Sequence, residues 1–199
     1  MSHSPAQHPC GSAVSREEGT GLAFQRSYPV SARRLWAAIA SSAGMAPWIG
    51  EYDGDPAAGS VSFRMTAEAV DAPAMTARIH RCEPGRRYEV STAEPAGGIH
   101  LILEIQDGAQ GAAAKEQGSA TVAGAESSQL IFTHLSSDPG AASMWGPGWE
   151  YYLDRLGHTL DKVTPEGAWP AADTISPTLL DFNEYPERFG AHYAAITLG

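Results

Sequence analysis

The chain has 199 residues, which suits one domain with tails, and its 23 acidic and 13 basic side chains give a formal net charge of -10. This charge argues against nucleic acid as a partner, because such binding depends on lysines and arginines that displace counterions from the phosphate backbone. No apolar stretch approaches the roughly 20 residues that cross a bilayer, and no signal-peptide segment is present, so we expect a cytoplasmic protein without a membrane partner. The two cysteines, Cys10 and Cys82, are too few for a disulfide framework or a four-ligand zinc site.

The N-terminal part of the sequence predicts a disordered segment, then a strand and two short helices. Residues 1–20 are rich in Ser, Gly, Pro and His without periodicity, which predicts a disordered leader. From residue 21, the sequence GLAFQRSY alternates large side chains, Arg26 among them, with small or polar ones, which is the period of a half-buried strand. Ser31 is an expected N-cap for a helix over residues 31–42, and residues 44–49 predict a second short helix or turn.

Four strand-like runs with turn signals between them follow, over residues 61–67, 75–83, 86–94 and 99–107. This order is typical of an antiparallel meander rather than of parallel strands joined by crossover helices. Glycine and alanine dominate residues 108–127, which predicts a mobile loop. A further strand is expected over residues 128–136, with Phe132 and His134 on the same face.

Residues 142–163 carry the clearest pattern in the chain. Their large apolar side chains recur at steps of three and four, which predicts an amphipathic helix about 20 residues and ~30 Å long. Glu150, Asp154 and Arg155 fall on the opposite, polar side, where we expect contact with solvent. Residues 164–199 contain several prolines and form an extension with a short aromatic helix around Tyr185 and Tyr193. This helix is expected to dock on its own domain, and docking on a second copy in a homodimer is the alternative.

The order of these elements predicts an α+β helix-grip fold, in which a curved antiparallel sheet wraps around a long C-terminal helix, with two short helices after the first strand. Segments 27–65, 79–90, 129–136 and 148–160 together resemble the START-like (SRPBCC) superfamily, most closely proteins related to the activator of Hsp90 ATPase. The resemblance covers a domain of residues 21–163. The Gly/Ala-rich insertion and the terminal extension depart from the shortest members of the superfamily.

The resemblance implies a cavity between the long helix and the concave face of the sheet, which holds a hydrophobic small molecule. A long helix on a curved sheet leaves gaps that side chains do not fill, and ligand pockets are apolar concavities of this kind. The alternative for each lining residue is a place in an ordinary packed core. The candidate ligand-binding residues are Phe63, Met65, Tyr88, Leu101, Leu103, Phe132, His134, Trp145, Trp149 and Tyr152.

Catalytic signatures are missing from the sequence. There is no nucleophile elbow, zinc helix, P-loop or dinucleotide loop, and Gly146-Pro147-Gly148 has no third glycine. We therefore assign no catalytic residue and no cofactor, and favour a protein that is not an enzyme. No metal site is assigned either. A pairing that turns Leu101 inward turns His100 outward, away from His134, whereas a one-residue slip in register reverses this, and no third carboxylate or imidazole is assigned to the same face.

Two other functions stay open from the sequence. The same pocket could catalyse a cyclisation, dehydration or hydrolysis of a hydrophobic substrate, with His134 or Tyr152 as acid or base. For His134, the alternative is a structural histidine hydrogen-bonded within the fold. The family name suggests a protein-interaction module, although no chaperone-contacting motif is visible.

Overall fold

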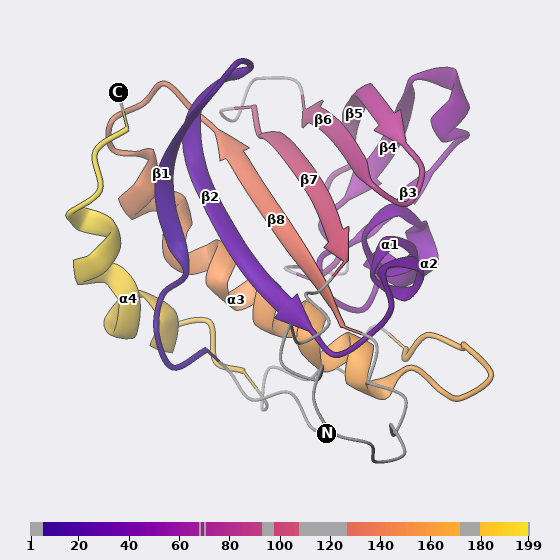
Figure 1. Ribbon diagram of the computed structural model, residues 1–199. Helices are drawn as coiled ribbons and strands as arrows, with labels where there is room; N and C mark the ends of the chain where they lie inside the picture. Colours follow the sequence, from indigo (N-terminus) through magenta and orange to yellow (C-terminus); the bar gives the residue numbers. More distant parts are fainter. Residues whose placement is uncertain are drawn as a thin grey trace, which may run out of the picture.

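One curved antiparallel sheet organises the chain, and a long helix crosses its inner face (Figure 1). The computed structural model describes residues 6–67, 69, 71–92, 98–107, 127–171 and 180–198. Eight strands lie in the order β1-β2-β8-β7-β6-β5-β4-β3. The strands are β1 (Gly11–Arg16), β2 (Gly19–Tyr28), β3 (Glu51–Asp53), β4 (Ser60–Arg64), β5 (Met75–Glu83), β6 (Arg87–Thr92), β7 (His100–Asp107) and β8 (Ser128–Leu135).

The helices lie on the concave side and at one end of the sheet (Figure 1). Short helices α1 (Ala32–Ala40) and α2 (Ser42–Met45) follow β2, and a 3₁₀ turn, η1 (Pro56–Ala58), precedes β4. The long helix α3 (Ala141–Lys162) crosses beneath β1, β2 and β8, and α4 (Glu184–Ala194) packs against it. The predicted α+β helix-grip fold is therefore confirmed. None of the described helices combines the length and the apolar character needed to span a bilayer.

The local signals in the sequence explain these elements. The Ser31 hydroxyl accepts a hydrogen bond from the Arg34 amide and caps α1, as its sequence predicts. In β2, Leu22, Phe24 and Tyr28 are buried, and Phe24 pairs with Phe132 of β8. The apolar sides of the central strands therefore face α3 and form one core with it.

The structure tests the predicted disordered leader in part and does not test the predicted mobile loop. The predicted leader is wrong over residues 11–20, because Gly11–Arg16 forms β1 and pairs with β2 from Gly11↔Phe24 to Arg16↔Gly19. The segment gains order by adding an edge strand rather than by burying an apolar face of its own. Residues 1–5 and 108–126 lie outside the described residues, so the predictions of a leader and a mobile loop there are not tested.

Candidate functional site

An apolar cavity of about 130 Å³ lies between the sheet and the segment that contains α1 and α2. Its walls come from the inner faces of β4 to β8, from α1 and α2, and from Trp149 of α3. None of the described residues that line it is Lys, Arg, His, Asp or Glu. The cavity is partly open to solvent. Helix α3 runs beneath β1, β2 and β8 and does not reach β4, β5 and β6 (Figure 1).

The open wall of the cavity is built from apolar side chains that are only half-buried. Phe63, Met75, Ile79 and Val90 belong to the inner faces of β4, β5 and β6, and each keeps part of its surface exposed. Apolar surface left in contact with water costs roughly 25 cal/mol per Å². Contiguous, partly exposed apolar surface of this kind is typical of ligand-binding grooves and interaction sites.

A β-bulge adds a sulfur atom to the wall. The register of β5 and β6 shifts between Ile79 and Arg81, so that Cys82 pairs with Tyr88 and shares its inward face. Strict alternation from Ile79 would have turned Cys82 outward. The sequence carries no signal for this bulge, which places Cys82 in the lining of the cavity.

Three ring side chains of the cavity are fixed by the end of α1. The indole nitrogen of Trp48 donates to the carbonyl oxygen of Ala38 at 3.0 Å. The Tyr88 hydroxyl donates to Ile39 at 2.8 Å, and the Tyr52 hydroxyl donates to Ala40 at 3.1 Å. The last carbonyls of a helix have no partner within the helix, so these three donors complete its hydrogen bonding. The rings therefore present only carbon to the cavity.

Seven of the ten candidate ligand-binding residues line the cavity, namely Phe63, Met65, Tyr88, Leu101, Leu103, Phe132 and Trp149. The other three, His134, Trp145 and Tyr152, lie behind it. Trp149 separates His134 from the cavity, and its indole nitrogen donates to His134 Nδ1 at 3.1 Å. Trp145 meets the His134 ring edge-on, and Tyr152 packs against Trp149.

His134 is held as a neutral hydrogen-bond acceptor. Burial, with a smaller contribution from the charge of His100, lowers its pKa from an ordinary 6.5 to about 4. Because Nδ1 accepts the proton of the Trp149 indole, a proton on that nitrogen would break the contact. This geometry fits the structural alternative for His134. It also separates both suggested acid/base residues, His134 and Tyr152, from the cavity lining.

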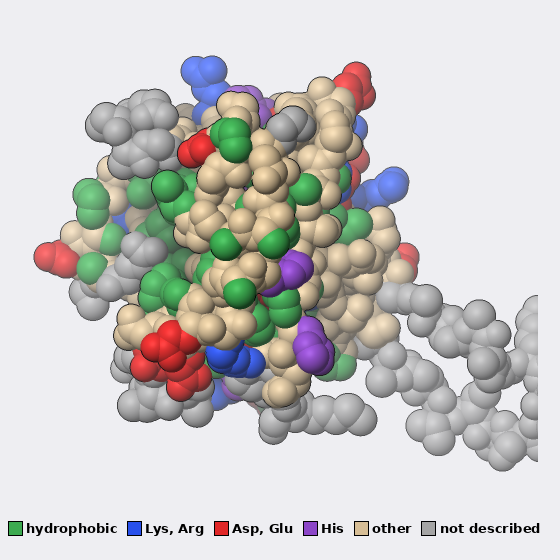
Figure 2. Space-filling view, turned by 90° about the vertical axis from the view of Figure 1, so that its left-hand side faces the viewer, with side chains coloured by type: hydrophobic (Ala, Val, Ile, Leu, Met, Phe, Trp, Pro, Cys, Tyr) green, Lys and Arg blue, Asp and Glu red, His purple; other side chains and the backbone are tan. Residues whose placement is uncertain are grey.

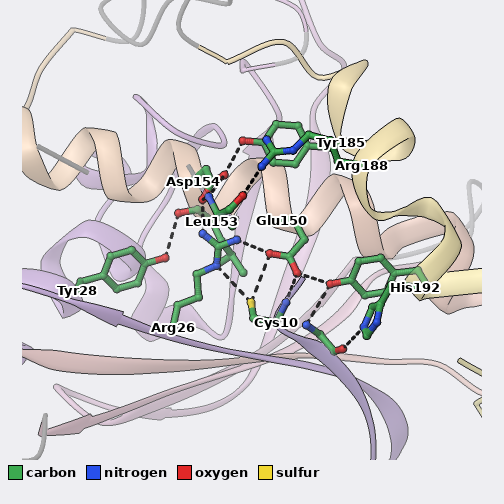
Figure 3. A network of polar contacts seen from close by, with 12 residues as sticks. Cys10, Arg26, Tyr28, Glu150, Leu153, Asp154, Tyr185, Arg188 and His192 are labelled. Atoms are coloured by element: carbon green, nitrogen blue, oxygen red, sulfur yellow. Dashed lines mark hydrogen bonds and ion pairs between the residues drawn. The ribbon is translucent and has the colours of Figure 1, made fainter. Parts of the chain in front are cut away.

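The opposite side of α3 carries a buried polar network, which we call the terminal clasp. We define it as Cys10, Arg26, Glu150, Asp154 and Tyr185 (Figure 3), together with Tyr193, whose hydroxyl bonds to Glu150. Glu150 and Asp154 are fully buried, and the guanidinium of Arg26 pairs with both carboxylates. Burial disfavours the charged form of Arg26, but the surrounding negative groups raise its pKa above the ordinary value. Two carboxylates thus share one guanidinium away from water.

Both ends of the described chain complete the clasp. The backbone amide of Cys10 donates to Glu150 at 2.6 Å, and that of Ala6 donates to Asp154 at 3.1 and 3.2 Å. From α4, the hydroxyl of Tyr185 donates to Asp154 at 2.6 Å, and the hydroxyl of Tyr193 donates to Glu150. The carboxylates of α3 therefore hold an N-terminal segment and a C-terminal helix at once.

Cys10 contributes its thiol to the same network. Burial and the negative charge of Glu150 raise its pKa to about 11, so the sulfur keeps its proton at neutral pH. It accepts a hydrogen bond from Arg26 Nε at 3.3 Å and contacts Glu150 Oε2 at 3.4 Å. The thiol is therefore a structural group of the clasp.

The expectation that Glu150, Asp154 and Arg155 meet solvent is wrong. The N-terminal segment and α4 cover the two carboxylates, and on the side of the molecule that carries β1 and α4 hydrophobic side chains lie between separate groups of charged ones (Figure 2). Arg155 is buried too, and it donates to the carbonyls of Pro47 and Trp48, at 3.0 Å each. Arg26 could have indicated this burial from the sequence. It lies on the inward face in the alternation of β2, and a buried guanidinium needs a buried partner of opposite charge.

Two histidines of the sheet, His100 and His134, do not lie together in a metal site. His100 pairs with Leu135 while its neighbour Leu101 pairs with His134, so His100 and His134 lie on opposite faces of the sheet. On the outer face, His100 Nε2 lies 2.8 Å from a carboxylate oxygen of Glu89. Within the part of the chain that the structure describes, no three His, Cys, Asp or Glu residues are grouped so as to hold a metal ion.

Comparison with known proteins identifies the class of fold. No family model matches the chain, and no curated protein matches it by sequence. Among solved structures, CalU16 from Micromonospora echinospora is similar in its solution structure, with a TM-score of 0.62, 18% identity and coverage of 98% of this chain and 97% of that one. Its crystal structure gives a TM-score of 0.59 at 19% identity, covering 94% and 98%.

A protein from Bordetella parapertussis is similar as well, with a TM-score of 0.53 at 20% identity, covering 92% of this chain and 95% of that one. At these identities the similarity shows the fold alone: the chain has a helix-grip α+β fold. Its membership of the START-like (SRPBCC) superfamily stays a prediction. The closer relationship to proteins related to the activator of Hsp90 ATPase stays a prediction.

Proposed function

We propose that this protein binds a hydrophobic small molecule in the cavity between the sheet, the α1–α2 segment and α3. The observation that carries the proposal is the half-buried apolar wall of β4, β5 and β6, which continues into a cavity without charged lining residues among those described. A ligand that covers this wall removes apolar surface from water, which stabilises the complex by roughly 25 cal/mol per Å².

The volume bounds the size of the enclosed part of the ligand. A cavity of about 130 Å³ is comparable with an engineered apolar cavity of roughly 150 Å³ in another protein, which holds benzene. The enclosed part is therefore one or two rings, or a short branched chain. A larger ligand extends through the opening along β4 and β5.

Filling the cavity tests the proposal. Ala77 points into the cavity from β5, whereas its neighbour Thr76 is exposed on the other face. We expect Ala77→Leu to keep the fold and to weaken binding of an uncharged fluorescent probe such as N-phenyl-1-naphthylamine at least tenfold. Thr76→Leu is the matched control and should bind as the wild type does. Equal probe affinity in all three proteins, or none in the wild type, would overturn the proposal.

Cys82 supplies an independent readout, because its thiol lines the cavity and is exposed. Saturating probe should slow the modification of Cys82 by a thiol reagent, as followed by peptide mass spectrometry. The hydrogen-bonded Cys10 serves as the internal control, since it lies in the clasp, and its rate should not respond. Native mass spectrometry of freshly purified protein then looks for a molecule that co-purifies.

A further inference from the structure

The cavity also defines the chemistry of its ligand, and this inference rests on the proposed function. We infer that the part of the ligand inside the cavity is uncharged and has no hydrogen-bonding group. The class of ligand is then a hydrocarbon or unsubstituted ring system, as opposed to a fatty acid, an aromatic acid or a polyhydroxylated ring.

The first argument concerns charge. A carboxylate placed in the cavity meets no counter-ion among the described lining residues. The buried guanidinium of Arg155 on α3 reaches the segment after α2, but it already donates to Pro47, Trp48 and the Tyr151 hydroxyl. Glu150 and Asp154 face the other side of α3, with Arg26 between them. An ionised ligand would therefore lose its hydration without replacement.

The second argument concerns hydrogen bonds. The hydroxyls of Tyr52 and Tyr88 and the indole nitrogen of Trp48 donate to three successive carbonyls at the end of α1. The fourth ring donor, the Trp149 nitrogen, is taken by His134. Each of these hydrogen bonds occupies both its donor and its acceptor, so neither group is left to bind a ligand in the cavity. A ligand hydroxyl inside would leave its own hydrogen bonds unmade.

Two weaker polar groups remain in the lining, and neither changes this result. The Thr92 hydroxyl oxygen accepts a hydrogen bond from the Ile99 amide at 3.0 Å, and because this side chain is only half-buried, its remaining proton can donate to solvent. Cys82 offers only a thiol, which is a weak donor, and it is exposed. The selectivity of the cavity comes from a wall whose polar atoms bond to one another, rather than from a group placed to repel polar ligands.

A matched series of ligands tests the inference: naphthalene, 2-naphthol and 2-naphthoate, measured by displacement of N-phenyl-1-naphthylamine at pH 7. We expect 2-naphthol to bind about tenfold more weakly than naphthalene, and 2-naphthoate at least about 100-fold more weakly. If naphthoate or naphthol equals naphthalene, the inference fails while the proposed function stands. If neither the probe nor naphthalene binds, the proposed function itself fails.

One variant tests the mechanism of this selectivity. Tyr88→Phe removes the hydroxyl that occupies the Ile39 carbonyl, so that an acceptor faces the cavity. The affinity for 2-naphthol relative to naphthalene should then rise several-fold. The control is Tyr28→Phe, which removes a hydroxyl bonded to the Leu153 carbonyl at 3.0 Å, outside the cavity lining. An unchanged ratio in Tyr88→Phe, or an equal rise in both variants, contradicts the mechanism.

Discussion

Around helix α3 apolar side chains are partly exposed on one side and charged side chains are buried on the other, the reverse of the usual arrangement. On one side, apolar residues such as Phe63 and Val90 stay half-exposed around a cavity. On the other side, the charged residues Arg26, Glu150 and Asp154 are buried in the terminal clasp. The comparison teaches that exposure follows the task of each region: the clasp fixes the helix, whereas under the proposed function the cavity is left open for a ligand.

The two regions also differ in how their contacts contribute to stability. A buried ion pair gains little net free energy, because desolvation offsets the attraction, but removal of one partner leaves a charge stranded. The half-buried cavity wall is apolar, so a substitution there leaves no buried charge without a partner. The variants below, in order of expected effect, test whether this difference holds.

The largest effect is expected from Arg26→Met, which leaves Glu150 and Asp154 buried without their cation. Urea unfolding should show a loss of about 3–5 kcal/mol. The matched control is Arg64→Met, because the pair of Arg64 with Glu51 is exposed at the edge of the sheet, and about 0–1 kcal/mol is expected there. Equal losses in the two variants would contradict the buried clasp.

Arg26→Met could also fail for lack of packing, and a combined variant separates the two causes. Adding Glu150→Gln and Asp154→Asn removes all three charges while keeping the shape of the side chains. If stranded charge is the cause, the combined variant is more stable than Arg26→Met alone. If the combined variant is less stable, packing rather than charge dominates the clasp.

The next effect concerns pH and the cavity side. Above pH 6.5, His134 is neutral in both the folded and the unfolded chain. As the pH falls from 6.5 to about 4, the imidazole becomes protonated in the unfolded chain but stays neutral in the folded chain. The free energy of unfolding therefore decreases, by about 3 kcal/mol in all. In His134→Gln, the side-chain oxygen can accept from Trp149 without titrating. Parallel stability curves for wild type and variant between pH 7 and 4 would refute this.

The smallest effect probes how α4 docks on α3. A methyl group at Gly146 would lie 2.3 Å from the Tyr193 ring, whereas at Gly148 the nearest atom is 3.8 Å away, on Phe182. Gly146→Ala should therefore destabilise by about 1–3 kcal/mol, and Gly148→Ala should stabilise by about 0.5–1 kcal/mol, both measured by urea unfolding.

Because Gly146 precedes Pro147, part of the cost of Gly146→Ala comes from the backbone alone. To separate the backbone cost from the clash with the ring, Gly146→Ala is also made in a Tyr193→Ala protein. In Tyr193→Ala the ring is gone, so the same substitution should cost less. An unchanged cost would mean that the ring does not lie on Gly146.

The sequence predicted the fold because its periodic signals are local. The alternation in β2 and β8 and the stripe of α3 each need only neighbouring residues, and seven of the ten expected cavity residues follow from such patterns. The errors arose where distant segments meet. Glu150 reads as a solvated residue until Cys10 and Tyr193, from the two ends of the chain, cover it. The inward turn of Cys82 depends on a bulge that alternation cannot reveal.

The hydrogen bonds at the end of α1 have a consequence for how fast a ligand exchanges. Moving the Tyr88 ring alone breaks one hydrogen bond, but lifting α1 breaks three together, those of Trp48, Tyr52 and Tyr88. We therefore expect this side of the cavity to move as one unit. We expect ligands to pass through the half-exposed side along β4 and β5, where Met65 and Met75 have flexible side chains. Substitutions at these two methionines should change the rates of binding and release more than the affinity.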